Sequence, residues 1–110
     1  MMKKIEAIVC PTKFEAVRDG LKAAGIVGRL IVTPVCGLQR SSAASVASPE
    51  SDTDLVRSIK IEVIVSDQLA RKAVNAVFDY MCSGKDEHAV GQITVLDIET
   101  TLPIGSDVAT

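Results

Sequence analysis

Two arginines stand at the two ends of a long polar stretch and could together hold an anion. Arg40 and Arg57 bracket a run of small and polar residues that contains SSAASVASPESDTD. A guanidinium offers a rigid fork of N–H donors, which suits phosphate or another small anion. The alternative interpretation is that both arginines are solvated charges beside a soluble loop. The pattern predicts an anion site but leaves this second interpretation open.

The other chemically active residue types are widely scattered. Three cysteines, Cys10, Cys36 and Cys82, are odd in number and far apart, which favours reduced thiols in the cytoplasm over a disulfide framework. His88 lies in a polar loop without a second ligand at metal-binding spacing. No Ser–His–Asp, paired-carboxylate or Gly-x-x-x-x-Gly-Lys arrangement is apparent. The sequence therefore predicts a protein that is not an enzyme, with no metal site and no cofactor.

Composition and charge exclude two classes of partner. The net charge is −2 and the isoelectric point is near 5.3, so the basic footprint of a nucleic-acid-binding protein is missing. No apolar run approaches the roughly 20 residues needed to cross a bilayer.

Aromatic residues make up only 3% of the chain and Trp is absent, so the core must consist of aliphatic side chains. The length of 110 residues predicts a single domain, 1–110.

The elements that must position these residues follow from hydrophobic periodicity. A capping box of Thr12 and Glu15 is expected to open the first helix, and Gly25 to end it. Ser66 or Asp67 is expected to cap the second helix, and Gly84 to end it. Period-two alternation predicts strands at about 3–11, 29–36, 58–65 and 92–98. The predicted core is Ile5, Ala7, Val9, Phe14, Val17, Leu21, Ala24, Ile59, Ile61, Val63, Val65, Leu69, Ala73, Ala76, Val77 and Tyr80.

The order β-α-β-β-α-β predicts a ferredoxin-like α+β sandwich, an antiparallel sheet with both helices on one face. Pro34 suggests that the second strand lies at an edge of the sheet or carries a bulge. The other face carries Ile8 and Ile64 among charged residues, and such a face invites a partner. We therefore expect an oligomer.

Four segments resemble the PII signal-transduction proteins, which are trimeric cytosolic regulators of nitrogen and carbon uptake. The segments are MKKIEAIVCPTKFEAVRDGLKAAGIVG, IVTPVCG, IKIEVIVSD and SGK…GQITVLDIE, and together they cover about residues 2–99. The resemblance implies a homotrimer. It also implies a T-loop at about 37–58 and a B-loop at 83–91. Independently of the resemblance, the weak patterning of the last residues predicts a flexible tail at 100–110. The T-loop would be mobile, would dock on a membrane transporter or metabolic enzyme, and would report which nucleotide is bound.

The resemblance further implies an adenine-nucleotide site between subunits. The B-loop would cradle phosphates with backbone N–H groups, a role that needs glycine because the backbone must approach the anion closely. The implied nucleotide-binding residues are Ile8, Gly37, Leu38, Gln39, Arg40, Glu62, Ile64, Gly84, Lys85, Gly91 and Gln92.

Several departures from the family pattern bear on the ligand. Gln92, Pro103 and Gly105 stand where the resemblance expects phosphate-binding cations. Ser41 stands in place of a glutamine and Ser58 in place of a lysine, with Arg57 beside it. We therefore expect ADP, AMP or cyclic AMP to be preferred over ATP with 2-oxoglutarate. The serine-rich loop resembles the PII-like branch linked to bicarbonate transporters and carboxysomes, which adds bicarbonate as a possible ligand.

Two other interpretations remain open. The copper-tolerance family shares the trimeric ferredoxin-like architecture, and Cys36, Cys82 and His88 are possible soft metal ligands. The chain could also be a degenerate PII scaffold that binds no ligand and acts only through contacts between subunits.

Overall fold

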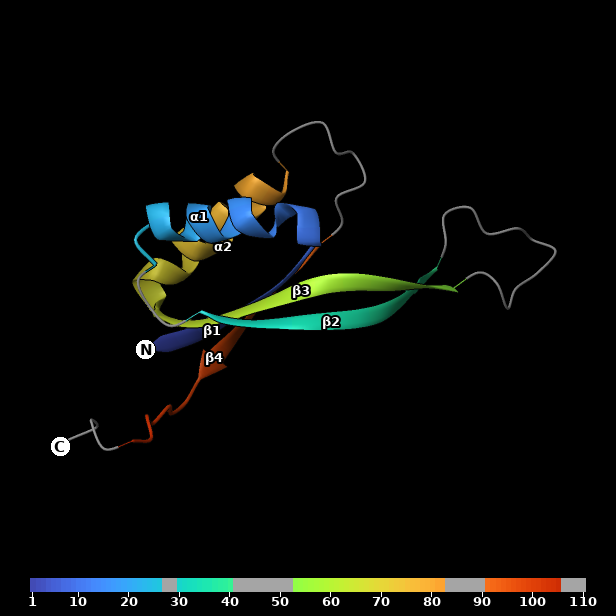
Figure 1. The fold of residues 1–110 in the computed structure, drawn as a ribbon. Helices are drawn as coiled ribbons and strands as arrows, with labels where there is room; N and C mark the ends of the chain where they lie inside the picture. The colour runs from blue at the N-terminus through green and yellow to red at the C-terminus, as the bar shows by residue number, and fades with distance from the viewer. Residues whose placement is uncertain (27–29, 41–52, 83–90, 106–110) are drawn as a thin grey trace.

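Two helices lie across one face of an antiparallel sheet in the computed structural model, which describes residues 1–26, 30–40, 53–82 and 91–105 (Figure 1). The strands are β1 (Met2–Val9), β2 (Ile31–Arg40), β3 (Thr53–Ser66) and β4 (Gln92–Ile98). The helices are α1 (Phe14–Ala23) and α2 (Asp67–Met81), and a short 3₁₀ turn, η1 (Pro11–Lys13), precedes α1. The strand order is β2-β3-β1-β4, so the ferredoxin-like prediction is confirmed.

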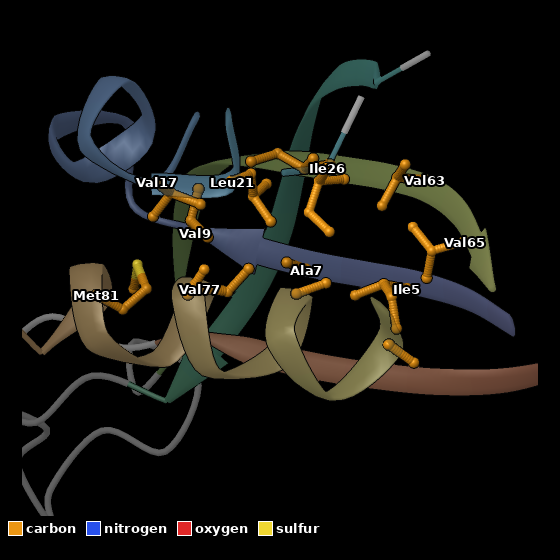
Figure 2. Close-up of a cluster of buried hydrophobic side chains, with 14 residues drawn as sticks. Ile5, Ala7, Val9, Val17, Leu21, Ile26, Val63, Val65, Val77 and Met81 are labelled. Carbon is orange, nitrogen blue, oxygen red and sulfur yellow. The ribbon is translucent and has the colours of Figure 1, made fainter. Parts of the chain in front are cut away.

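The core lies between the sheet and the helices. Ile5 of β1 pairs with Val63 of β3 and with Val95 of β4, and this register turns alternate residues toward the helices. Figure 2 shows the buried side chains of the strands and helices converging on one layer. The layer consists of Ile5, Ala7, Val9, Val17, Leu21, Ile26, Ile61, Val63, Val65, Ala70, Ala73, Ala76, Val77 and Met81. Most of the predicted core is thus confirmed, although Tyr80 is 38% exposed.

The start of α1 differs from the prediction. Lys13, at its N-cap position, makes no side-chain capping bond, and the backbone N–H of Lys13 donates to the Cys10 carbonyl at 2.9 Å. Pro11 begins a 3₁₀ turn ahead of the helix and has no N–H that needs a partner. The Thr12–Glu15 capping box was therefore a wrong prediction, because the turn places both residues out of register for it.

The other helix boundaries agree with the sequence. Gly25 has a φ of 83°, and the N–H of Ile26 donates to the Leu21 carbonyl at 3.0 Å. This is a Schellman motif, in which glycine takes the left-handed position without a Cβ penalty. Ser66 occupies the N-cap position of α2, although its side chain makes no capping bond. The predicted end of α2 at Gly84 falls outside the described residues.

Strands β2 and β3 are longer than predicted. Their pairing continues from Gly37 opposite Val56 to Arg40 opposite Thr53, so both ends of the segment predicted as the T-loop, 37–58, are strands. The polar sequence hid this extension, because backbone pairing does not require alternating side chains. Pro34 lies in the edge strand β2, as predicted. The paired residues 35–40 and 53–58 form a projecting hairpin, which we call the stem (Figure 1). We predicted mobility for about residues 40–56. Of these, 40 and 53–56 are paired strand residues, and 41–52 lie outside the described residues.

We predict that Gly20→Ala destabilises the domain. A Cβ at this buried position of α1 would lie 2.3 Å from Cδ2 of the Tyr80 ring on α2. Overpacking of this kind typically costs about 1–3 kcal/mol. In a Tyr80→Ala background the same change should be neutral or stabilising by up to about 1 kcal/mol, because alanine is the better helix former. Urea unfolding of the four proteins measures this coupling, and an equal effect of Gly20→Ala in both backgrounds would contradict it.

Candidate functional site

The face of the sheet opposite the helices carries the largest group of predicted site residues. Alternation in the register places Lys4, Glu6 and Ile8 of β1 there, beside Lys60, Glu62 and Ile64 of β3. All six are half-buried in the single chain. We call this surface the open face.

Three ion pairs link the charged residues of the open face. Glu6 and Glu62 lie directly opposite each other, a pairing that would be repulsive by itself. Lys4 Nζ lies 2.7 Å from Glu62 Oε2 and 3.1 Å from Glu6 Oε1, and it therefore bridges the two carboxylates. Lys60 Nζ lies 3.4 Å from Glu62 Oε1. The hydrogen bond from Lys4 is the main cause of a lowered pKa of Glu62, and the same bond is the main cause of a raised pKa of Lys4.

We predict that this cluster makes stability depend on pH. Because the folded pKa of Glu62 lies below its ordinary value of 4.5, its contribution is present above that pH and is lost as the pH falls through the lowered pKa. The Glu62→Gln variant should therefore be less stable than the wild type at pH 7, with a difference that shrinks toward pH 3. Urea titrations across this range measure it.

The Lys4→Met variant supplies the control. Removing Lys4 removes the main cause of the lowered pKa of Glu62, so Glu62→Gln should have a smaller effect in that background. A difference between Glu62→Gln and wild type that stayed constant from pH 7 to pH 3 would show that the ion pairs contribute nothing.

Two hollows lie on either side of the Lys60–Glu62 ion pair. The first, of about 440 Å³, is formed at the base of the stem, and we call it the stem hollow. It is lined by Ile8, Val35, Cys36, Gly37, Leu38, Val56, Ser58 and Lys60. The second, of about 380 Å³, lies where β4 ends, and we call it the strand-end hollow. It is lined by Lys4, Ile31, Glu62, Val63, Ile64, Ile98, Thr100 and Thr101.

The predicted nucleotide-binding residues are divided between these places. Ile8, Gly37 and Leu38 line the stem hollow, whereas Glu62 and Ile64 line the strand-end hollow. Gln39 and Arg40 belong to the last paired rungs of β2. Gly84 and Lys85 lie outside the described residues. Within one chain, therefore, the apolar residues expected to hold a base do not surround a single cavity.

Gly91 and Gln92 line a third cavity, an apolar groove of about 450 Å³ between α2 and β4. A Cβ on Gly91 would lie 2.8 Å from the backbone carbonyl oxygen of Ile8. Glycine is therefore required at position 91 for packing against β1, whether or not a phosphate binds there. The residue pattern alone could not separate these two reasons.

Arg40 and Arg57, which we predicted to bind an anion together, lie at different positions along the stem. Arg40 pairs with Thr53, whereas Arg57 pairs with Cys36. The two pairs lie four residue steps apart, which corresponds to about 13 Å of strand length at 3.3 Å per residue. A shared anion would have to span that length, so the register favours separate roles for the two residues.

Sequence reasoning missed several lining residues. Lys4, Ile31, Thr100 and Thr101 border the strand-end hollow beside the predicted Glu62. The signal for Lys4 was present, because period-two alternation puts it on the same face as Glu6 and Ile8. Thr100 and Thr101 follow β4 without any periodic pattern, so only the structure places them.

In the part of the chain that the structure describes, neither a metal-binding cluster nor a membrane-spanning helix is present. Within it, no three His, Cys, Asp or Glu side chains gather in a group that could hold a metal ion. His88 lies outside that part, and Cys36 and Cys82 line different cavities. None of the described helices is both long and apolar enough to span a bilayer.

Comparison with known proteins agrees with this geometry. A family model described as Nitrogen regulatory protein P-II matches residues 2–107. Proteins of that name from Pasteurella multocida and Cereibacter sphaeroides are 33% and 34% identical to the chain, each over 105 residues. The match covers 94% of this chain and 91% of each relative. Nitrogen regulatory protein P-II 1 of Escherichia coli K12 is 32% identical over the same share.

The chain belongs to the PII family. The resemblance inferred from the four segments is therefore confirmed, and the match extends past β4 to residue 107. The ferredoxin-like sheet, the projecting stem and the open face are accordingly those of a PII protein. Its placement in the bicarbonate-transporter branch stays a prediction, as do the residues of the nucleotide site.

Proposed function

We propose that this PII protein is a homotrimeric regulator that binds an adenine nucleotide between subunits. It signals through residues 41–52, the segment that connects the two strands of the stem. The proposal rests on one observation: the predicted nucleotide-binding residues line two separate hollows within a single chain. Ile8, Gly37 and Leu38 line one hollow, and Glu62 and Ile64 line another. A site in which one copy supplies the first group and its neighbour supplies the second would surround a base on both sides.

The two hollows have complementary chemistry for a nucleoside. The stem hollow offers apolar surface from Ile8 and Leu38, against which a base can pack. The strand-end hollow offers the carboxylate of Glu62, which can accept hydrogen bonds from ribose hydroxyls or an amino group. Glu62 already has Lys4 and Lys60 as partners, so its charge is compensated before a neutral sugar arrives.

The residues expected to lie near the phosphates of the nucleotide favour a ligand with few phosphates. Gln92 at the start of β4 is uncharged, and Pro103 and Gly105 supply no cation after that strand. Each charge-assisted hydrogen bond to a phosphate contributes about 1.5–3 kcal/mol. Outer phosphates therefore add charge to the ligand without gaining cationic partners from these three positions. AMP, ADP or cyclic AMP is the ligand class that this arrangement fits, with bicarbonate as a second anion to be tested.

We predict that AMP or ADP binds at least as tightly as ATP and that 2-oxoglutarate has no effect. The Gln92→Lys variant should strengthen ATP binding by about tenfold or more, the equivalent of one charge-assisted bond, and should change AMP binding little. Titration calorimetry with AMP, ADP, ATP and cyclic AMP, with and without bicarbonate, measures both effects.

Thr94→Lys is the matched control for this variant. Thr94 lies two residues further along β4 on the same face, and its hydroxyl accepts a hydrogen bond from the Gln92 amide at 3.4 Å. A lysine there should leave the ratio of ATP to AMP affinity unchanged. Tight ATP binding by the wild type that strengthened with 2-oxoglutarate would refute the preference for few phosphates. Absence of binding by every adenine nucleotide would favour the degenerate-scaffold alternative.

The assembly can be tested without a ligand. Light scattering at micromolar concentration should give the mass of three chains, because the divided site needs a neighbour and the resemblance to PII proteins implies a trimer. A monomeric mass would remove the basis for a site between subunits. Regulation of a transporter or enzyme of carbon or nitrogen metabolism is part of the proposal, and it follows from family membership rather than from any contact in the single chain.

A further inference from the structure

One face of α2 carries a stripe of residues whose chemistry changes along the helix. Positions 71, 74, 75, 78 and 82 recur at helical spacing, so they share a face, with Cys82 at the C-cap position. Arg71 and Asn75, nearer the start of the helix, are polar, whereas Val74 and Phe78 are apolar. The stripe from Arg71 to Cys82 is about 16 Å long at 1.5 Å per residue.

The apolar groove between α2 and β4 lies along the later half of this stripe. Its floor is formed by buried Val77 and Met81, and its walls include Phe78 and Val95, which are 61% and 46% exposed. An aromatic ring with this exposure on a regular amphipathic helix marks an incompletely covered surface. The groove volume of about 450 Å³ lies within the range of sites that bind small molecules.

A second cavity, of about 510 Å³, adjoins the groove toward the start of α2. The two cavities share Val74 and Val95. The other residues that line the second cavity are Lys3, Asp67, Ala70, Arg71 and Asn75. The two cavities together therefore form an amphipathic surface along α2, apolar beside Phe78 and polar beside Arg71, which we call the α2 channel.

The polar end of the α2 channel has one cation to offer to a ligand. Lys3 is already the partner of two carboxylates, since its Nζ lies 3.6 Å from Asp67 Oδ1 and also forms an ion pair with Asp97. Arg71, in contrast, forms no ion pair with any residue that the structure describes. Asn75, one turn further along α2, lines the same cavity and adds amide N–H donors. A guanidinium fork beside an amide is a donor set that suits a carboxylate.

We propose that the α2 channel binds an amphipathic carboxylate of the medium-chain fatty-acid class, with its head group on Arg71 and its acyl chain against Phe78 and Val95. Donors for an anion gather at one end of the channel, and the groove that follows is lined mainly by apolar side chains, which is the pattern of a linear amphiphile. The end of the acyl chain would lie beside Cys82. The site requires neither a nucleotide nor a neighbouring copy, so it goes beyond the proposed function and can fail separately from it.

Titration calorimetry with octanoate, decanoate and 1-octanol, each below its micellar or solubility limit, tests both halves of the site. Decanoate should bind roughly tenfold more tightly than octanoate, because it buries two more CH₂ groups in the groove. Absence of decanoate binding, or equal affinities for the two acids, would overturn the proposal.

Matched variants test the head-group contact. Arg71→Gln should weaken octanoate and decanoate by about tenfold or more, the equivalent of one charge-assisted hydrogen bond, and should leave the affinity for 1-octanol unchanged. Lys72→Gln is the control, because it removes the same charge from the next residue, which is exposed and lines neither cavity. Equal losses in the two variants would show a long-range attraction rather than a contact and would overturn the assignment of Arg71.

The cysteines of the wild-type chain report where the acyl chain lies. Cys82 lines the groove and Cys36 lines the stem hollow, and both are exposed. Peptide mass spectrometry can follow alkylation of both thiols by iodoacetamide in one sample. With decanoate at about ten times its dissociation constant, alkylation of Cys82 should slow about tenfold, because the free fraction falls by that factor, while Cys36 reacts as before.

Three outcomes of the alkylation experiment would count against the proposal. Decanoate that binds without protecting Cys82 would place the acyl chain elsewhere. Equal protection of Cys36 and Cys82 would indicate non-specific coating of the protein. A Cys82 thiol that is unreactive before any decanoate is added would show that another copy already covers the groove.

Discussion

The pairing register of β1 and β3 is the constraint on which the rest of the molecule depends. Ile5 lies opposite Val63 and Ala7 opposite Ile61, so one face of both strands is wholly aliphatic. A slip of one residue would turn every side chain to the other face and drive Lys4 and Glu6 into the core. The same register therefore builds the hydrophobic layer, sets the ion pairs around Glu62, and places Ile8 beside the stem.

Much of this architecture could be predicted because it depends on strong local signals. Alternation in β1 and β3 and the left-handed glycine at position 25 each have one physical interpretation. The start of α1 could not be predicted in the same way. Thr12 and Glu15 have capping-box spacing, but Pro11 initiates a 3₁₀ turn that competes with it. The full length of the stem was hidden because its pairing rests on backbone hydrogen bonds rather than on a hydrophobic pattern.

The candidate site was harder to predict than the fold. Family resemblance selects Ile8, Glu62 and Gly91, but it does not show that Ile8 and Glu62 line separate hollows in one chain. Gly91 illustrates a second difficulty, since close packing on the Ile8 carbonyl and closeness to an anion require the same residue. A glycine in the sequence indicates only that a larger side chain is not tolerated at that position. The structure is needed to show which group, such as the Ile8 carbonyl, would clash with that side chain.

The stem has a consequence for how this protein can change over evolutionary time. Because Arg40 and Thr53 are paired, the two ends of the intervening segment are held together by the ladder and not by the segment's own sequence. Loop-closure entropy grows slowly with length, so doubling that segment would cost only about 0.6 kcal/mol. Its composition and length can therefore drift toward new recognition partners while the sheet beneath it stays under a separate, stricter selection for packing.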